Sequence, residues 1–196
     1  TNPAVRIVVL RGTGKSFSAG GDLNWMRRMA GYSREENLTD AIGLATMLRT
    51  LNELPKPTLA VIHGHCFAGA VGLVAACDIA IAADPVQFAL TEVRLGLIPA
   101  TIGPYVVAAM GARACRRYFL TAERFGVAEA HRLGLVHEVV GQDDLDAAAE
   151  RHIGNLLLAG PTALAAAKEL IRAVDGPVTD AMVADTAVRI ADARSG

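Results

Sequence analysis

The chain has 196 residues, a length typical of a single domain, and a formal net charge of −1 at pH 7. A hydrophobic share of 52% excludes a disordered chain, and the apolar runs are all shorter than the ~18 residues of a membrane span. The near-neutral charge argues against nucleic acid or an anionic membrane as a partner. Three cysteines without a CxxC spacing argue against disulfides and a zinc site, and favour a reducing, cytoplasmic location.

The N-terminal part of the sequence predicts one strand and two helices. Residues 5–10 are largely apolar, as is typical of a strand buried on both faces. A helix is predicted over residues 24–29, after a glycine-rich turn. Ser33, with Glu36 three residues later, has the pattern of a capping box and predicts a helix over residues 34–53.

The rest of the chain alternates strands and helices. The predicted strands are 57–63, 78–82, 87–89 and 135–140. The predicted helices are 68–76, 113–122, 127–133, 143–158, 163–174 and 177–193. This alternation favours an α/β fold with parallel pairing and right-handed crossovers.

Two glycine-rich turns, residues 17–23 and 64–70, each follow an apolar strand and are each expected to lead directly into a helix. The first backbone N–H groups of a helix have no intrahelical acceptor and carry partial positive charge. Two such turns brought together could direct two donors at one oxygen, which is an oxyanion hole. The alternative is that these are ordinary turn glycines.

Five ordered motifs resemble the crotonase (enoyl-CoA hydratase/isomerase) superfamily. They are Lys15-x-Phe17-Ser18-Ala19-Gly20-Gly21-Asp22-Leu23, Gly64 to Leu73, Cys77-Asp78-Ile79, Glu92 to Pro99, and Ala128-Glu129-Ala130-x-x-Leu133-Gly134-Leu135-Val136. Two further segments, residues 24–29 and 99–102, are most similar to bacterial methylglutaconyl-CoA and carboxygeranoyl-CoA hydratases.

The resemblance implies a ββα spiral core with C-terminal helices, assigned here to residues 1–140 and 141–196. It also implies a homotrimer or dimer of trimers, an acyl-CoA thioester substrate, and no separate cofactor, since coenzyme A is part of the substrate. In the family two backbone N–H groups hold the thioester oxygen, and these correspond to Gly21 and Gly69. The family's downstream catalytic glutamate corresponds to Glu92. The predicted substrate-binding residues are Lys15, Ser18, Ala19, Asp22, Leu23, Trp25, Met26 and Ala68.

The sequence departs from the family pattern in three ways. The family's other catalytic glutamate falls at Gly72, and Ala68 and Ala70 stand where glycines are common. The family's N-terminal strands precede Thr1 and its last helix lies beyond Gly196. We therefore expect a fragment that lacks part of the coenzyme A site.

The chemistry of the predicted site centres on Glu92. Its apolar neighbours in sequence, Phe88, Leu90 and Val93, are expected to raise the pKa of its carboxyl group toward neutrality, as acid–base catalysis requires. Hydration of an enoyl thioester is the favoured reaction. Double-bond isomerisation, which needs only one base, and acyl-CoA binding without turnover are the alternatives.

Several predicted site residues also have simpler structural interpretations. Glu92 could lie on the surface at the end of a strand, and Asp22 is expected to cap a helix. Trp25 and Met26 could line an acyl pocket or only pack their helix, while Lys15 could hold a coenzyme A phosphate. The alternating His63 and His65 point to opposite sides, which argues against a shared metal, and the cysteines are expected to be buried.

Overall fold

The computed structural model describes residues 2–195, with Leu23 described by its backbone alone. Four parallel strands form the main sheet in the order β1-β2-β4-β7. These strands are β1 (Val8–Arg11), β2 (Thr58–Ile62), β4 (Ile79–Asp84) and β7 (Glu138–Gly141). A smaller sheet contains β3 (His65–Phe67), β5 (Gln87–Ala89) and β6 (Phe125–Gly126), in that order.

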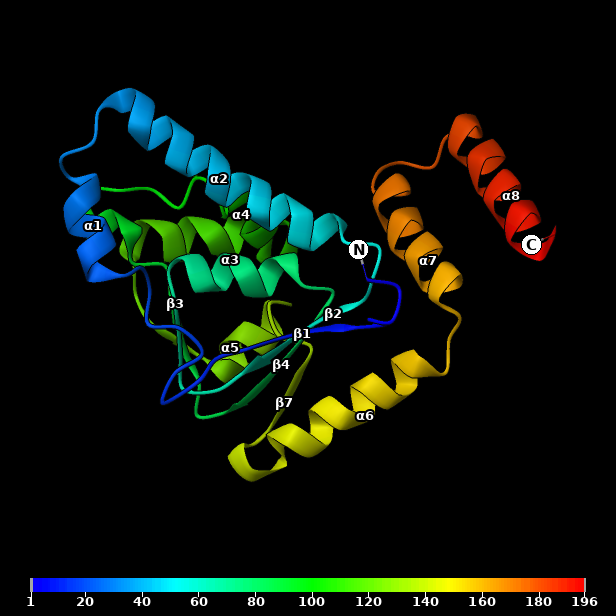
Figure 1. The fold of residues 1–196 in the computed structure, drawn as a ribbon, viewed down its shortest axis with the longest axis horizontal. Coiled ribbons are helices and arrows are strands. Elements are labelled where there is room, and N and C mark those ends of the chain that lie inside the picture. The colour runs from blue at the N-terminus through cyan, green and yellow to red at the C-terminus, as the bar shows by residue number, and fades with distance from the viewer. Residues whose placement is uncertain (1, 196) are drawn as a thin grey trace.

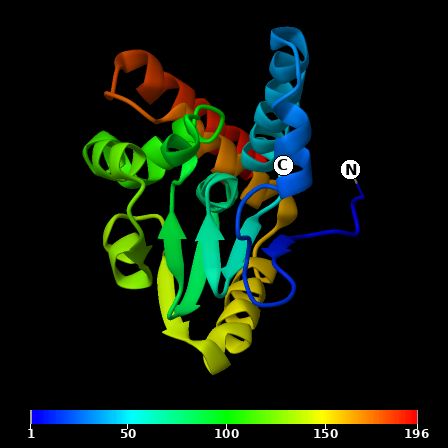
Figure 2. The same cartoon turned by 90° about the vertical axis from the view of Figure 1, so that its left-hand side faces the viewer.

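Helices surround the main sheet (Figures 1 and 2). They are α1 (Leu23–Met29), α2 (Arg34–Glu53), α3 (Gly69–Ala76), α4 (Gly103–Thr121), α5 (Val127–Arg132), α6 (Leu145–Leu157), α7 (Pro161–Ala173) and α8 (Asp180–Ser195), with the 3-10 helices η1 (Glu92–Leu95) and η2 (Gln142–Asp144). Helix α3 packs between α2 and α4, and α6 packs on β2, β4 and β7. The predicted α/β fold is confirmed. Among residues 2–195, no helix is both long and apolar enough to cross a membrane.

The main sheet is buried most deeply along β2 and β4. All five residues of β2 are buried, as expected for a central strand with a neighbour on each side. The prediction that residues 5–10 form a strand buried on both faces is wrong. The strand β1 begins at Val8, alternates half-buried and exposed residues, and leaves Val9 42% exposed. In the described part of the chain β1 pairs only with β2, so β1 is an edge strand.

The predicted helix over residues 34–53 is confirmed as α2, together with its cap. The Ser33 hydroxyl accepts a hydrogen bond from the Glu36 N–H at 3.2 Å, and the Ser33 N–H donates to the Glu36 carboxylate at 2.7 Å. Two boundary predictions are wrong. Helix α4 begins at Gly103 rather than at residue 113, and Gly111 interrupts it with φ 77° and ψ 151°. The strand β3 separates β2 from α3, so the second glycine-rich turn does not lead directly into a helix.

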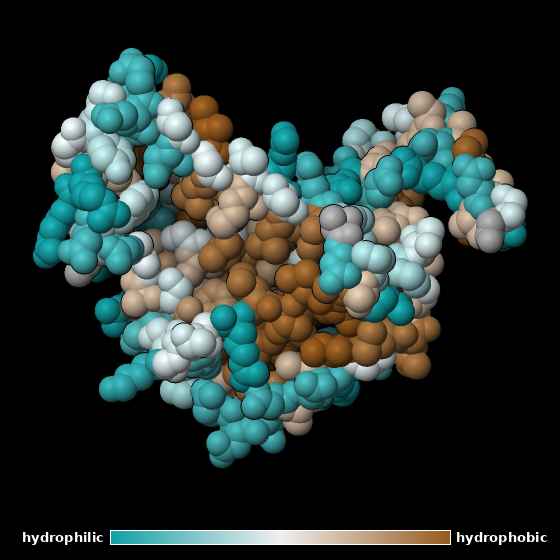
Figure 3. All heavy atoms as spheres, viewed as in Figure 1, coloured by the Kyte–Doolittle hydropathy of each residue, from teal (hydrophilic) through white to brown (hydrophobic). Residues whose placement is uncertain are grey.

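Helices α7 and α8 lie apart from the core and contain no buried residues (Figure 1). Helix α7 is held by Lys168, whose Nζ lies 2.8 Å from Asp78 Oδ2 and donates to the Lys56 carbonyl at 3.2 Å. Asp78 also accepts from the Thr58 N–H at 2.7 Å and hydroxyl at 2.8 Å. Figure 3 shows apolar side chains gathered on the face turned to the viewer.

Candidate active site

Backbone hydrogen bonds bring the two glycine-rich turns together. Ser18 forms a parallel bridge with Cys66 of β3. The Ser18 N–H donates to the His65 carbonyl at 3.0 Å, and the Phe67 N–H donates to the Ser18 carbonyl at 3.1 Å. Gly21 follows Ser18 by three residues, and Gly69 follows Phe67 by two. Both glycines therefore lie just beyond the same end of this small sheet.

The strand β5 brings Glu92 to that end as well. The parallel register of β3 and β5 pairs Phe67 with Ala89, and the Ala68 N–H donates to the Ala89 carbonyl at 2.8 Å. Glu92 follows Ala89 by three residues and is the first residue of η1. Three neighbouring parallel segments thus deliver Gly21, Gly69 and Glu92 at their carboxyl ends, the side of parallel strands where α/β proteins bind ligands.

The N–H groups of Gly69 and Gly21 are available to a ligand. Gly69 is the first residue of α3, so its N–H has no intrahelical acceptor. Within residues 2–195, neither this N–H nor that of Gly21 donates to a protein acceptor. Ala68, which precedes α3, has φ 52° and ψ −124°, a backbone conformation that L residues rarely adopt. Backbone conformations of this kind are found most often at functional sites.

The carboxyl group of Glu92 is partly removed from water. Its Oε2 atom is buried without a hydrogen-bond partner in the described part of the chain. Desolvation raises the pKa of this carboxyl group above its ordinary value, and a hydrogen bond to its own backbone opposes the shift. Glu92 does not lie at the end of a strand; it is half-buried and is the first residue of η1. An unpaired, desolvated carboxyl group with a raised pKa is suited to proton transfer.

Asp22 caps helix α1, as the structural interpretation expected. Its carboxylate accepts from the Asn24 N–H at 2.7 Å and from the Trp25 N–H at 2.8 Å. Both hydrogen bonds, the one from Trp25 more strongly than the one from Asn24, lower the pKa of the exposed Asp22 carboxyl group. Because both bonds hold the start of α1, Asp22 positions the turn that carries Gly21.

Trp25 and Met26 lie next to Gly21. A Cβ on Gly21 would be 3.4 Å from Trp25 Cζ3 and 3.8 Å from Met26 Cγ. Trp25 is half-buried, and its indole N–H donates to Asp40 on α2 at 3.4 Å, a contact that no sequence pattern indicated. Both side chains are therefore close enough to Gly21 to contact a ligand held by its N–H.

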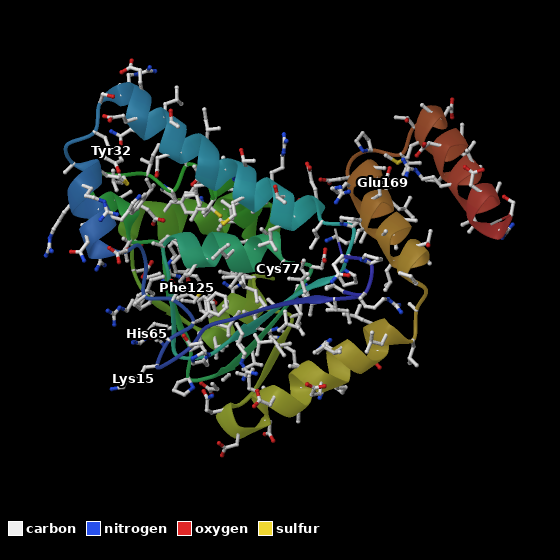
Figure 4. All side chains as sticks on the ribbon, viewed as in Figure 1. Lys15, Tyr32, His65, Cys77, Phe125 and Glu169 are labelled. Carbon is white, nitrogen blue, oxygen red and sulfur yellow. The ribbon has the colours of Figure 1, made fainter. Side chains whose placement is uncertain are left out.

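The remaining predicted site residues lie along the first turn. Leu23 is the first residue of α1, and the structure describes only its backbone. Ser18 Oγ accepts from the Gly20 N–H at 3.4 Å, and Ala19 is exposed. The Lys15 side chain points outward into solvent (Figure 4). The Lys15 backbone carbonyl explains why residue 64 is a glycine. At Gly64 φ is +65°, and a Cβ would lie 2.1 Å from the Lys15 oxygen.

The histidines and cysteines have local roles. The His63 ring Nε2 lies 3.0 Å from the Gly14 carbonyl, and the exposed His65 ring stacks on Phe67 with centroids 4.9 Å apart. The expected burial of the three free cysteines is confirmed.

Position 72, where the family's other glutamate would stand, has no space for a side chain. A Cβ on Gly72 would lie 2.1 Å from Ile102 Cγ2. Sequence reasoning missed this contact, because nothing in the pattern around residue 102 links it to α3.

Two surface pockets adjoin helix α4. One, of about 550 Å³, lies between α4 and α5 and is lined by residues that include Arg113, Arg116 and Arg132. The other, of about 470 Å³, lies between α2 and the start of α4, beside Ile42 and Tyr105. The residues that line these two pockets do not include Gly21, Gly69 or Glu92.

Comparison with known proteins agrees with the motifs. Residues 1–190 match the family described as enoyl-CoA hydratase/isomerase. A crystal structure of an enoyl-CoA hydratase from Shewanella pealeana is 46% identical, with a TM-score of 0.96 over 100% of this chain and 73% of its own. A Thermus thermophilus relative is 35% identical over 89% of this chain and 69% of its own length. The enoyl-CoA hydratase ACTT6 of Alternaria alternata is 35% identical over 86% of this chain, which spans only 55% of that protein.

The ordered motifs, the crotonase-like architecture and the match over residues 1–190 agree with one another, and the chain belongs to the enoyl-CoA hydratase/isomerase family of enzymes.

Proposed function

We propose that this chain is an enoyl-CoA hydratase that adds water across the α,β double bond of an acyl-CoA thioester. One observation carries the proposal: two N–H groups without protein acceptors, at Gly21 and Gly69, lie at the same end of the small sheet as the desolvated carboxyl group of Glu92. This arrangement suits a reaction that places negative charge on a carbonyl oxygen while a proton moves nearby.

Gly21 and Gly69 are proposed to hold the thioester oxygen. Attack of water on the β-carbon moves electrons through the double bond onto this oxygen and gives an enolate. Two fixed N–H donors stabilise the charge as it forms, and the loss of one such donor typically slows a reaction by about 10²–10³-fold. No metal or cofactor is needed for this step.

Glu92 is proposed to move both protons. As a carboxylate, it takes a proton from the attacking water while the water oxygen bonds to the β-carbon. The carboxylic acid so formed gives its proton to the α-carbon, and the enolate returns to a thioester. The raised pKa supports both roles, because the group then exchanges protons more readily near neutral pH.

The second candidate is a double-bond isomerase. In that reaction Glu92 takes a proton from the α-carbon of a 3-enoyl thioester and returns it to the γ-carbon. The absence of a side chain at Gly72 favours this alternative, because isomerisation needs only one acid–base group.

The acyl group is proposed to resemble methylglutaconyl, on the likeness of residues 24–29 and 99–102 to hydratases of that type. Trp25 and Met26, which lie beside Gly21, are proposed to contact the acyl chain. Ser18, Ala19, Asp22, Leu23 and Ala68 are proposed to shape the thioester end of the site, and the exposed Lys15 is proposed to hold a coenzyme A phosphate.

The assembly is proposed to be a homotrimer or a dimer of trimers. Helices α7 and α8 support this because they carry apolar side chains that the chain itself leaves uncovered, such as Ile171 at 69% and Val183 at 56% exposure.

Absorbance at the enoyl-thioester band, with crotonyl-CoA, 3-methylglutaconyl-CoA and a 3-enoyl-CoA, tests the proposal. A loss of the band with either of the first two, together with a 3-hydroxyacyl product, would support a hydratase. Growth of the band with the 3-enoyl substrate alone would support an isomerase. No change with any substrate, while the protein binds acyl-CoA, would support binding without turnover.

A further inference from the structure

Gly72 is a buried residue of α3 whose place is determined by packing. A Cβ at this position would lie 2.1 Å from Cγ2 and 2.5 Å from Cβ of Ile102, shorter than any real contact between carbon atoms. Gly72 has a helical conformation that any L residue can adopt, so backbone geometry does not require glycine here. The side chain of Ile102 is what excludes every other residue.

Ile102 cannot easily move out of this space. Its side chain is 2% exposed, and its carbonyl accepts from the N–H groups of Tyr105 and Val106, each at 3.1 Å, at the start of α4. A β-branched side chain also has few alternative rotamers. Helix α4 contacts both α3, which begins at Gly69, and η1, which begins at Glu92.

We propose that Ile102 determines which reactions this site can carry out. By filling the space that a side chain at position 72 would need, it keeps a second carboxyl group out of that position and leaves the proton transfers of the proposed reaction to Glu92. Ile102 is a positioning residue in this scheme, because it acts by exclusion. The chemical part of the inference rests on the proposed function, whereas the packing part does not.

Thermal unfolding tests the packing. Gly72→Ala is expected to lower Tm by about 2–12 °C, the effect of overpacking a core in a chain of this length. Gly43→Ala is the matched control, since Gly43 lies in α2 with nothing within 4 Å of its Cβ position and is expected to raise Tm. In an Ile102→Gly background, the loss caused by Gly72→Ala should disappear. Glycine is tolerated at the helix cap that Ile102 occupies. A Gly72→Ala variant as stable as Gly43→Ala would overturn the proposal.

Turnover tests the chemistry. The double variant Gly72→Glu, Ile102→Gly is compared with Ile102→Gly alone on crotonyl-CoA and a 3-enoyl-CoA. A second carboxyl group is expected to raise the ratio of hydration to isomerisation by about 10-fold or more. An unchanged ratio, or a folded double variant without turnover, would overturn the proposal. An unsubstituted protein that turns over neither substrate would instead refute the proposed function, and the unfolding experiment would still decide the packing.

Discussion

Replacing Glu92 by Gln should make the protein less active and more stable at the same time. The substitution keeps the size of the side chain but removes its charge and its capacity to transfer protons. Acid–base catalysis typically contributes about 10²–10⁴-fold, so kcat should fall at least about 100-fold. In free energy, that fall is at least about 2.7 kcal/mol of lost transition-state stabilisation.

The gain in stability follows from removing the charge of a partly desolvated carboxylate, whose Oε2 atom has no partner in the described part of the chain. Leaving a buried polar group unpaired costs about 1–3 kcal/mol, and it costs more for a charged group than for the neutral amide that replaces it. Glu92 is only partly buried, so we expect the low end of this range, about 1 kcal/mol, which corresponds to a rise in Tm of about 2–4 °C. A stabilising change that removes activity is the expected signature of a residue kept for function.

The gain in stability from Glu92→Gln should depend on pH. Burial raises the pKa of Glu92 in the folded protein, so the folded state binds its proton more tightly than the unfolded chain. The free-energy cost of a charged Glu92 in the folded protein is absent below the pKa of the unfolded chain, near pH 4. This cost grows as the pH rises through the pKa of the folded protein. The difference in Tm between Glu92→Gln and the unsubstituted protein should therefore be near zero at low pH and largest at about pH 8.

Thermal unfolding at about pH 4 and about pH 8, together with enoyl-CoA turnover, forms the assay. Glu150→Gln is the control, because Glu150 is exposed on α6, and it should change neither activity nor stability. Unchanged turnover in Glu92→Gln would remove Glu92 from the mechanism. A lower stability at pH 8 would show that the carboxylate makes a stabilising contact, and the argument from its unpaired oxygen would fail.

Three further substitutions, the last with a control variant, test other parts of the structure. Gly69→Pro removes an N–H from the proposed oxyanion hole and should lower kcat by about 100-fold or more, whereas retained turnover would contradict that role. Ala68→Gly relieves the backbone strain at φ 52° and should raise the free energy of unfolding by about 1 kcal/mol in a urea titration, and a loss of stability would show that no strain is present. Lys168→Met leaves Asp78 without its cation and should cost about 2–3 kcal/mol by the same titration. Arg49→Met, which breaks an exposed pair at 3.8 Å, should cost about 0.5 kcal/mol or less, and equal losses would refute the argument from burial.

Local rules predicted much of the secondary structure. The helix over residues 34–53 follows from a capping box and spaced apolar residues, both of which act within a few residues. The start of α4 was missed because Gly111 interrupts the helix and because no side chain caps its first turn. The strand β3 was missed because its three residues acquire a strand conformation only by pairing with β5 and Ser18.

The sequence by itself determined the family, the α/β alternation of most elements and the residues that could take part in chemistry, because motif order and local hydrogen bonding are encoded along the chain. Only the tertiary structure decided that Glu92 carries an unpaired buried oxygen and that Ile102 fills the space beside Gly72. Both facts depend on atoms that are close in space and distant in sequence. Burial and steric exclusion are properties of the packed chain, and no local pattern specifies them.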